Sequence, residues 1–215
     1  MNTLLQINSG LKGPKSHSSR LAASLSRALL STHPGAKLIR RDLSEKPIPH
    51  LDHATFRTFL DPGTAMTPDQ KAGLARSDAL IAELKEADVL VIGAPMYNFM
   101  VPSTLKSWID HVVRAGETFQ FTEAGPAGLL KDKEAYVAIA QGGKFLGTPQ
   151  DLETGFLKMV LNLMGISKIK FVYAEGLAMG DEMAAAGLAA AQRTIDHLCA
   201  ANAAQTPALE TEAGL

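Results

Sequence analysis

The stretch "VLVIGAPMYNFMVPSTLKSWIDHVVRAG", residues 89–116, joins an apolar strand, an aromatic turn and an amphipathic helix. Residues 89–94 are apolar at both odd and even positions, which is the pattern of a strand covered on both faces in a parallel sheet. Pro95 ends this strand, and a helix with one apolar stripe is predicted at 103–115. The stripe consists of Leu105, Trp108, Ile109, Val112 and Val113. A strand followed directly by a helix is one unit of an α/β fold.

The rest of the chain repeats this alternation. Apolar runs predict further buried strands at 3–8, 135–140 and 168–176, and the more polar stretch 36–43 suits a strand at the sheet edge. Helical spacing of apolar residues predicts helices at 18–32, 67–86, 151–164 and 181–202. The predicted fold class is therefore α/β, with a doubly wound, five-stranded parallel sheet and helices on both faces.

Length and composition fit one folded domain. The chain has 215 residues, of which 46% are hydrophobic and 20% charged. Residues 1–202 are predicted to form a single domain, with an irregular excursion at 44–66 and a flexible C-terminal tail at 203–215.

Charge and targeting patterns exclude several classes of function. A net charge of −1 gives no reason to expect nucleic acid or an anionic membrane as a partner. The N-terminus does not resemble a signal peptide, and no apolar run approaches the length of a membrane span. The single cysteine, Cys199, cannot form an internal disulfide and fits a reducing compartment. We expect a soluble, cytoplasmic protein in which Cys199 only packs.

Ligands of such sheets bind beyond the carboxyl ends of the strands. The loop after the first strand, "NSGLKGPKSHSSR" (8–20), is rich in serine and leads into a helix N-terminus, which favours an anion. Ser16 and Ser18 can donate hydrogen bonds to a phosphate, but serine is also the usual helix cap. On this loop alone, capping is the simpler interpretation.

The loop after the third strand offers a flat apolar surface. Met96, Tyr97 and Phe99 can contact a planar ring, while the Asn98 amide can meet a polar ring edge. Ordinary core packing explains each apolar residue singly, but it would bury Asn98 without an evident partner. After the fourth strand, the glycines of "AIAQGGKFLG" (138–147) either allow close approach of a ligand to backbone amides or form an ordinary turn. A phosphate site beside a ring platform suits flavin mononucleotide (FMN).

The motifs S-x-S at 16–18, "APMYNF" at 94–99, "QGG" at 141–143 and "FVYAEG" at 171–176 resemble those of the FMN-dependent NADH–quinone oxidoreductases, also called azoreductases. The resemblance implies a flavodoxin-like fold, one non-covalent FMN per subunit, and no catalytic side chain or metal. It implies ping-pong hydride transfer from NADH or NADPH to a quinone or azo substrate, and a homodimer with the active site at its interface. The implied FMN contacts are Ser9, Gly10, Ser16, His17, Ser18, Pro95, Met96, Tyr97, Asn98, Phe99, Ala140, Gln141, Gly142 and Gly143. The implied substrate-pocket residues are Phe99, Phe121 and Phe145.

The chain departs from the family pattern at several places. His17 stands where relatives often have an amide side chain, and backbone contact with a solvated ring is the favoured interpretation. Ala140-Gln141 replaces a common Ser-Arg pair, which removes a positive charge near the flavin. Phe121 replaces a tyrosine. The stretch "RTFLDPGTA" (57–65) is expected to sit over the nicotinamide site, with Arg57 as a contact.

Two further expectations concern the region around the helix at 103–115. Its stripe, with Trp108, Val112 and Val113, is expected to exceed what one sheet face covers and so to support the dimer. His111 is placed on its polar side or at the dimer seam. The "HLDH" cluster at 50–53 is read as a solvated turn, because its spacing is wrong for a metal site.

Two other functions remain as alternatives to this interpretation. One is a flavodoxin-type FMN carrier of single electrons that does not turn over small molecules. Such carriers are typically strongly acidic, whereas this chain is nearly neutral. The other is a regulatory α/β domain that binds no flavin.

Overall fold

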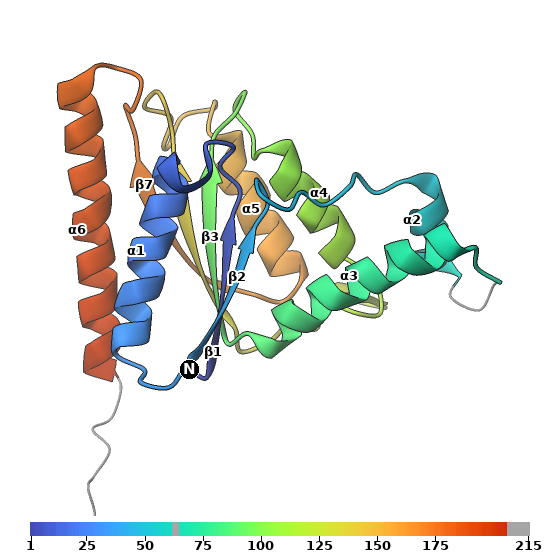
Figure 1. Cartoon of the computed structure of the whole chain (residues 1–215). Helices are drawn as coiled ribbons and strands as arrows, with labels where there is room; N and C mark the ends of the chain where they lie inside the picture. Colours follow the sequence, from blue (N-terminus) through green and yellow to red (C-terminus); the bar gives the residue numbers. More distant parts are fainter. Residues whose placement is uncertain (62–64, 206–215) are drawn as a thin grey trace, which may run out of the picture.

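The computed structural model describes residues 1–61 and 65–205 and is built on a five-stranded parallel sheet of order β2-β1-β3-β6-β7 (Figure 1). The sheet strands are β1 (Thr3–Asn8), β2 (Lys37–Asp42), β3 (Val89–Pro95), β6 (Glu134–Ala140) and β7 (Lys168–Ala174). The helices are α1 (His17–Ser31), α2 (His53–Leu60), α3 (Pro68–Glu86), α4 (Ser103–Val112), α5 (Leu152–Leu163) and α6 (Asp181–Gln205). A short 3-10 turn, η1 (Gly13–Lys15), precedes α1, and a hairpin of β4 (Phe119–Thr122) and β5 (Gly125–Gly128) follows α4.

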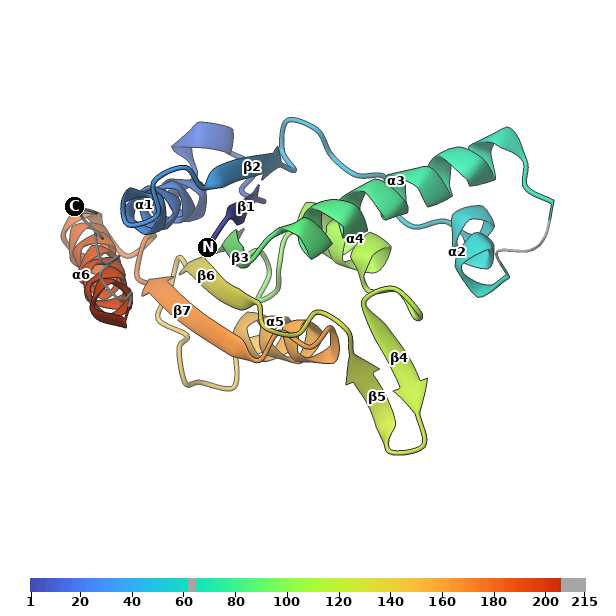
Figure 2. The ribbon, with the colours of Figure 1, turned by 90° about the horizontal axis from the view of Figure 1, so that it is seen from below.

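The helices cover both faces of the sheet, as predicted. Figure 2 shows α1 and α6 on one side, and α3, α4 and α5 on the other. Successive side chains of a strand point to opposite faces of the sheet. Leu4 packs in the hydrophobic cluster under α1 and α6, and Leu5 packs in the cluster under the other helices. This double burial explains why the strands lack polar alternation. The predicted fold class and the edge position of the second strand are confirmed.

The strand order reverses between β1 and β3. The chain passes from β1 outward to β2 and then returns across β1 to β3. Such a switch point opens a crevice at the carboxyl ends of the strands, where doubly wound proteins bind their ligands. The loops after β1, β3 and β6 all lie at that end.

The region 44–66 is not wholly irregular, so that expectation was wrong. Residues 53–60 form α2, whose first turn is capped by Asp52, because its carboxylate accepts a hydrogen bond from Thr55 N at 2.7 Å. The "HLDH" cluster therefore starts a helix. Helix α3 begins with a capping box, in which the side chains of Thr67 and Gln70 accept hydrogen bonds from each other's backbone N–H.

The apolar stripe of α4 is core. Trp108 is 1% exposed and Val112 is fully buried, both in the cluster between the sheet and α3, α4 and α5. The stripe therefore does not support a dimer, contrary to expectation. His111 is 1% exposed rather than on a polar side, with its Nε2 3.1 Å from the carbonyl of Pro49. Burial lowers the pKa of the His111 imidazole.

Helix α6 continues to Gln205, and the rest of the predicted tail, 206–215, lies outside the described residues. Among the helices that the structure describes, none is both long and apolar enough to cross a membrane.

Candidate functional site

The three predicted loops meet in one cavity of about 250 Å³ at the carboxyl ends of the strands. The first loop contributes Lys12, Ser16 and His17; the third contributes Pro95, Met96 and Tyr97; the fourth contributes Ala140, Gln141 and Gly142. Residues far apart in the sequence thus converge on one site.

Two further lining residues, Leu177 and Ala178, were not predicted from the sequence. They follow β7, and their N–H groups donate to the carbonyls of Gln141 (3.1 Å) and Gly142 (2.9 Å). These bonds fix the fourth loop against the segment after β7. The glycine that ends "FVYAEG" could have indicated a turn here. Gly176 has a φ of +71°, a backbone conformation that favours glycine.

The first loop is arranged to receive an anion. Ser16 precedes α1 but makes no side-chain capping bond; its Oγ lies 3.1 Å from the Ser18 Oγ instead. Capping, the simpler sequence interpretation, is therefore not what the Ser16 hydroxyl does. The two hydroxyls lie beside the free amides at the start of α1, where the helix dipole favours negative charge. A Cβ on Gly10 would overlap the Ser16 side chain, so glycine is needed for this arrangement.

Ser9 has a different part in this loop. It is fully buried, and its Oγ donates to the carbonyl of Gly93 at 2.7 Å. Its hydroxyl ties β1 to β3 and is already used by the protein. Gly93 matters as well, since a Cβ there would come within 2.8 Å of the Ser18 carbonyl oxygen. The sequence could have indicated this role of Gly93, because a glycine inside a buried strand often marks the close approach of another backbone segment.

The third loop is a tight turn with unusual backbone geometry. Tyr97 and Met100 exchange backbone hydrogen bonds of 2.9 and 3.1 Å. The residues between them, Asn98 (φ 50°) and Phe99 (φ 66°), are both left-handed, as in a type I′ turn. This conformation is common for asparagine and unfavourable for phenylalanine, and such strain concentrates at functional sites. Asn98 is exposed, so the alternative in which this turn is core packing that buries the Asn98 amide does not hold.

The fourth loop brings its backbone close to the cavity. A Cβ on Gly143 would lie 2.6 Å from the Phe145 ring, so glycine lets this ring fold back over the loop. Glu175 Oε1 accepts hydrogen bonds from the N–H groups of Phe145 (2.7 Å) and Leu146 (2.8 Å), which anchors the segment. Gln141 is fully buried, and neither polar atom of its amide has a partner in the structure.

His17 does not simply face water. It is half-buried in the first turn of α1, lines the cavity, and has a buried Nδ1 without a hydrogen-bond partner. The expectation of a solvated ring is corrected by this burial.

Only two of the three aromatic pocket candidates lie together. The rings of Phe99 and Phe145 meet edge to face with centroids 5.6 Å apart. Phe121 is 77% exposed on the β4–β5 hairpin, which projects away from the sheet (Figure 2). The hairpin is fixed at the opposite end of the strands, where Leu130 N donates to Met164 O. A single chain therefore does not assemble a pocket from all three.

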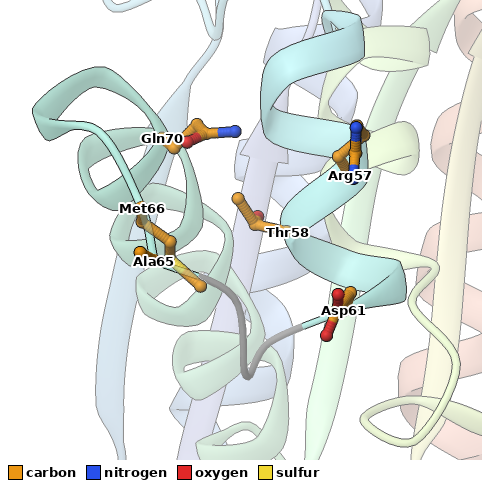
Figure 3. Close-up of a pocket in the computed structure, with 6 residues that line it drawn as sticks. All are labelled: Arg57, Thr58, Asp61, Ala65, Met66 and Gln70. Atoms are coloured by element: carbon orange, nitrogen blue, oxygen red, sulfur yellow. The ribbon is translucent and has the colours of Figure 1, made fainter.

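Arg57 lies in a separate cavity of about 220 Å³ between α2 and the start of α3 (Figure 3). Its neighbours there are Thr58, Asp61, Ala65, Met66 and Gln70. Within one chain, Arg57 is thus not part of the cavity that the three loops form, contrary to the speculative assignment. Residues 62–64 of the "RTFLDPGTA" stretch lie outside the described residues.

Glu153 was not singled out from the sequence. This residue of α5 is fully buried, and neither carboxylate oxygen has a partner in the structure. Burial and, to a lesser degree, the nearby Asp151 carboxylate raise the pKa of Glu153 to about 8. Glu153 is therefore mainly neutral at pH 7. Glutamate is rarely fully buried, so the residue pattern of α5 did not indicate the burial of Glu153.

The single cysteine lies outside the residues that line the cavity. Cys199 is half-buried, and burial raises the pKa of its thiol. Within the part of the chain that the structure describes, no three His, Cys, Asp or Glu side chains gather as metal ligands would.

Comparison with known proteins agrees with this geometry. A family model for the flavodoxin-like fold matches residues 2–198. The FMN-dependent NADH:quinone oxidoreductase 6 of Burkholderia lata is 46% identical over 195 residues, which cover 91% of this chain and 98% of that protein. The FMN-dependent NADH:quinone oxidoreductase of Aromatoleum aromaticum is 46% identical over 193 residues, covering 90% of this chain and 97% of that protein.

A solved structure is also similar. It is an FMN-dependent NADH-azoreductase from Bacillus anthracis in complex with FMN, with a TM-score of 0.85 and 25% identity over 94% of this chain and 100% of that one. Family model, relatives and structure agree on the same family. The chain belongs to the family of FMN-dependent NADH:quinone oxidoreductases and azoreductases, which has the flavodoxin-like fold.

Proposed function

We propose that this protein is an FMN-dependent oxidoreductase that takes two electrons from NADH or NADPH and passes them to quinones, with reductive cleavage of aromatic azo bonds as a related activity. The observation that carries the proposal is the convergence of the loops after β1, β3 and β6 on one cavity. The names of the relatives and of the FMN-bound structure give the same chemistry.

The cavity fits FMN in two respects. Ser16 lines the cavity, and its hydroxyl lies 3.1 Å from that of the buried Ser18 at the start of α1, where free amides suit the phosphate. Met96 and Tyr97, with Ala140 and Gly142, line the wall against which the ring system would lie. Gly10, His17, Pro95, Asn98, Gln141 and Gly143 complete the proposed set of contacts. Ser9 supports this set through its bond to Gly93.

Bound FMN would supply the hydride chemistry, since it accepts two electrons from a nicotinamide and gives them to an acceptor in a second step. The protein groups hold the reactants and exclude water. Backbone amides of the fourth loop can stabilise negative charge at the polar edge of the ring system, where such preorganised donors are effective. The Phe99–Phe145 ring pair, formed by the third and fourth loops, would offer an apolar surface to a planar substrate. No acid–base side chain is required.

We further propose a homodimer in which the partner covers the cavity. The outward face of α5 carries Leu152 (54% exposed), Phe156, Met159 (72% exposed) and Leu163, spaced on one helical stripe. Phe121 and Leu129 extend the apolar surface along and beside the hairpin. Neither Phe121 nor Arg57 reaches the cavity of its own chain. In a dimer, these residues would contribute to the cavity of the partner subunit. A monomeric mass at working concentration would contradict the dimer.

A cytoplasmic location is part of the proposal. The single cysteine fits a reducing compartment, which also maintains the pool of reduced nicotinamide.

The test is steady-state oxidation of NADH and NADPH by FMN-loaded protein with a benzoquinone as acceptor. Multiple turnovers per bound flavin support an enzyme. A protein that binds FMN without turnover would instead be a flavodoxin-type carrier. A colourless protein that gains no visible absorption on addition of FMN would exclude both.

A further inference from the structure

The segment that follows β7 holds the two halves of the fourth loop in different ways. Backbone hydrogen bonds of 2.8 to 3.1 Å hold the first half: Gln141 N donates to Ala174 O, and the N–H groups of Gly176, Leu177 and Ala178 donate to the carbonyls of Gly143, Gln141 and Gly142. The second half is held by a side chain. Glu175 Oε1 accepts hydrogen bonds from Phe145 N at 2.7 Å and Leu146 N at 2.8 Å. Only the second half therefore depends on the Glu175 carboxylate.

Glu175 is itself firmly placed. It directly follows β7, and a Cβ on Gly187 of α6 would overlap its carbonyl oxygen, so α6 lies against its backbone. Its half-buried side chain borders a cavity of about 260 Å³ between the fourth loop and α6. One carboxylate oxygen that accepts two successive N–H groups fixes the direction of both peptide planes, and hydrogen bonds to a charged acceptor are stronger than neutral ones. The sheet and α6 thus hold the loop through this carboxylate.

The peptide that Glu175 holds carries the Phe145 ring. This ring folds back over Gly143 and meets the Phe99 ring edge to face, at a centroid distance of 5.6 Å. Thr148 bonds the Phe145 carbonyl, but this closes a turn within the loop. In the described part of the chain, the hydrogen bonds that join residues 144–148 to another element both end on Glu175 Oε1. Loss of the carboxylate would therefore release the Phe145 ring from its fixed position.

We propose that Glu175 is a positioning residue for the electron acceptor, because it holds the Phe99–Phe145 surface in place for a planar quinone ring. This statement rests on the proposed function. Aromatic rings attract one another only in certain arrangements, and a surface that is already ordered binds its ligand at a lower entropic cost. The contribution of Glu175 therefore appears in the KM for the acceptor. The affinity for FMN, whose proposed contacts end at Gly143, does not depend on it.

The experiment compares Glu175→Leu, which has no acceptor oxygen, with Glu175→Gln, whose amide oxygen can still accept both N–H groups. With benzoquinone as acceptor, the KM of Glu175→Leu should be roughly tenfold higher, the factor of one well-placed aromatic contact. Its kcat at saturating quinone and its FMN dissociation constant should change little. Glu175→Gln should recover most of the KM. Glu182→Gln, which removes an exposed carboxylate at the start of α6, is the control and should leave KM unchanged.

Two further measurements separate positioning from a general loss of structure. Amide hydrogen exchange in the apoprotein should become faster at Phe145 and Leu146 in Glu175→Leu, but not at residues 141–143. In a double-mutant cycle, adding Glu175→Leu to Phe145→Leu should raise the KM no further, because Glu175 acts through this ring. If Glu175→Leu does not fold, Glu175→Asp decides. It keeps the charge but is too short to reach both N–H groups, so its KM should also rise.

Several results would overturn the inference. An unchanged KM, although exchange at Phe145 and Leu146 is faster, means that the position of the ring does not affect the acceptor. A weaker affinity for FMN, with faster exchange at residues 141–143, means that Glu175 supports the whole loop. Additive effects on KM in the double-mutant cycle mean that Glu175 does not act through Phe145. Failure of the unchanged, FMN-loaded protein to reduce any quinone would instead overturn the proposed function.

Discussion

The hydroxyl of Tyr97 accepts a hydrogen bond from the backbone N–H of Leu11 at 3.3 Å and so joins the third loop to the first. The third loop is joined to the fourth in turn, because Met96 N donates to Ala140 O at 2.9 Å. The elements proposed to hold the phosphate and the rings are thus connected directly, before any ligand is considered.

Tyr97→Phe should weaken FMN binding without unfolding the protein. The change removes one neutral hydrogen bond between the two loops, which corresponds to about 0.5–1.5 kcal/mol, or roughly a two- to tenfold higher dissociation constant. Tyr173→Phe is the matched control, since its hydroxyl lies 3.0 Å from Thr154 of α5, outside the cavity lining. Fluorescence titration decides; equal effects of the two variants would contradict a role for the Tyr97–Leu11 bond.

Gly10→Ala should destabilise the first loop, because the new Cβ overlaps the Ser16 side chain. Overpacking of this kind costs about 1–3 kcal/mol of unfolding free energy. The double variant Gly10→Ala/Ser16→Gly removes the overlapping atoms and should recover most of that stability in urea unfolding. Its FMN affinity should remain low, because the Ser16 hydroxyl is also gone. Recovery of both properties would show that Ser16 does not contact the cofactor.

Glu153 should make stability depend on pH above the acid range. The pKa of Glu153 in the folded protein, about 8, lies above its usual value of 4.5, so the folded protein binds this proton more tightly than the unfolded chain does. The contribution of the protonated group is complete below pH 4.5 and is lost as pH rises toward 8. At 1.36 kcal/mol per unit of pKa shift, the loss is on the order of 5 kcal/mol.

Glu153→Gln removes this titration and preserves the shape of the side chain. Urea unfolding at several pH values should show the stability of the unchanged protein falling relative to this variant between pH 5 and 8.5. The difference is the informative quantity, because carboxylates with lowered pKa, such as Asp42 and Asp88, change the stability of both proteins at low pH. A difference that is constant with pH would mean that Glu153 is ionised in the folded protein.

Met159→Glu should dissociate the proposed dimer. Met159 is 72% exposed at the centre of the α5 stripe, and a charge there would be buried against the partner. Lys158→Glu, at the adjacent exposed position but off the stripe, is the control and should leave the mass unchanged. Light scattering measures the mass, and quinone reduction should fall with it. An unchanged dimeric mass for Met159→Glu would mean that the dimer interface does not include the α5 stripe.

The strands and the three loops could be predicted because each has a local signal. Double burial makes β1, β3 and β6 mainly apolar on both faces, and the loops that follow them contain serine, proline and glycine. The eight-residue α2 was missed because its apolar positions are few and its neighbours include proline. The hairpin was missed because each of its strands has only 4 residues, and Gly125–Gly128 contains two glycines and a proline, which weaken a strand signal.

Errors of burial had a different cause. Helical spacing identified the stripe of Trp108 and Val112, but not that the sheet face and its neighbouring helices cover all of it. Likewise, His111 and Glu153 have polar side chains, which are usually exposed, whereas the packing of α4 and α5 buries them. The position of Asn98 depended on a left-handed turn, which the sequence permits but does not demand.

Anaerobic mixing of the FMN-loaded protein, first with NADH and then with a benzoquinone, tests the central claim most directly. The visible absorption of the bound flavin should disappear on the first addition and return on the second, with one flavin per chain. A flavin that NADH does not bleach, or one that remains free in solution beside the protein, would contradict the account.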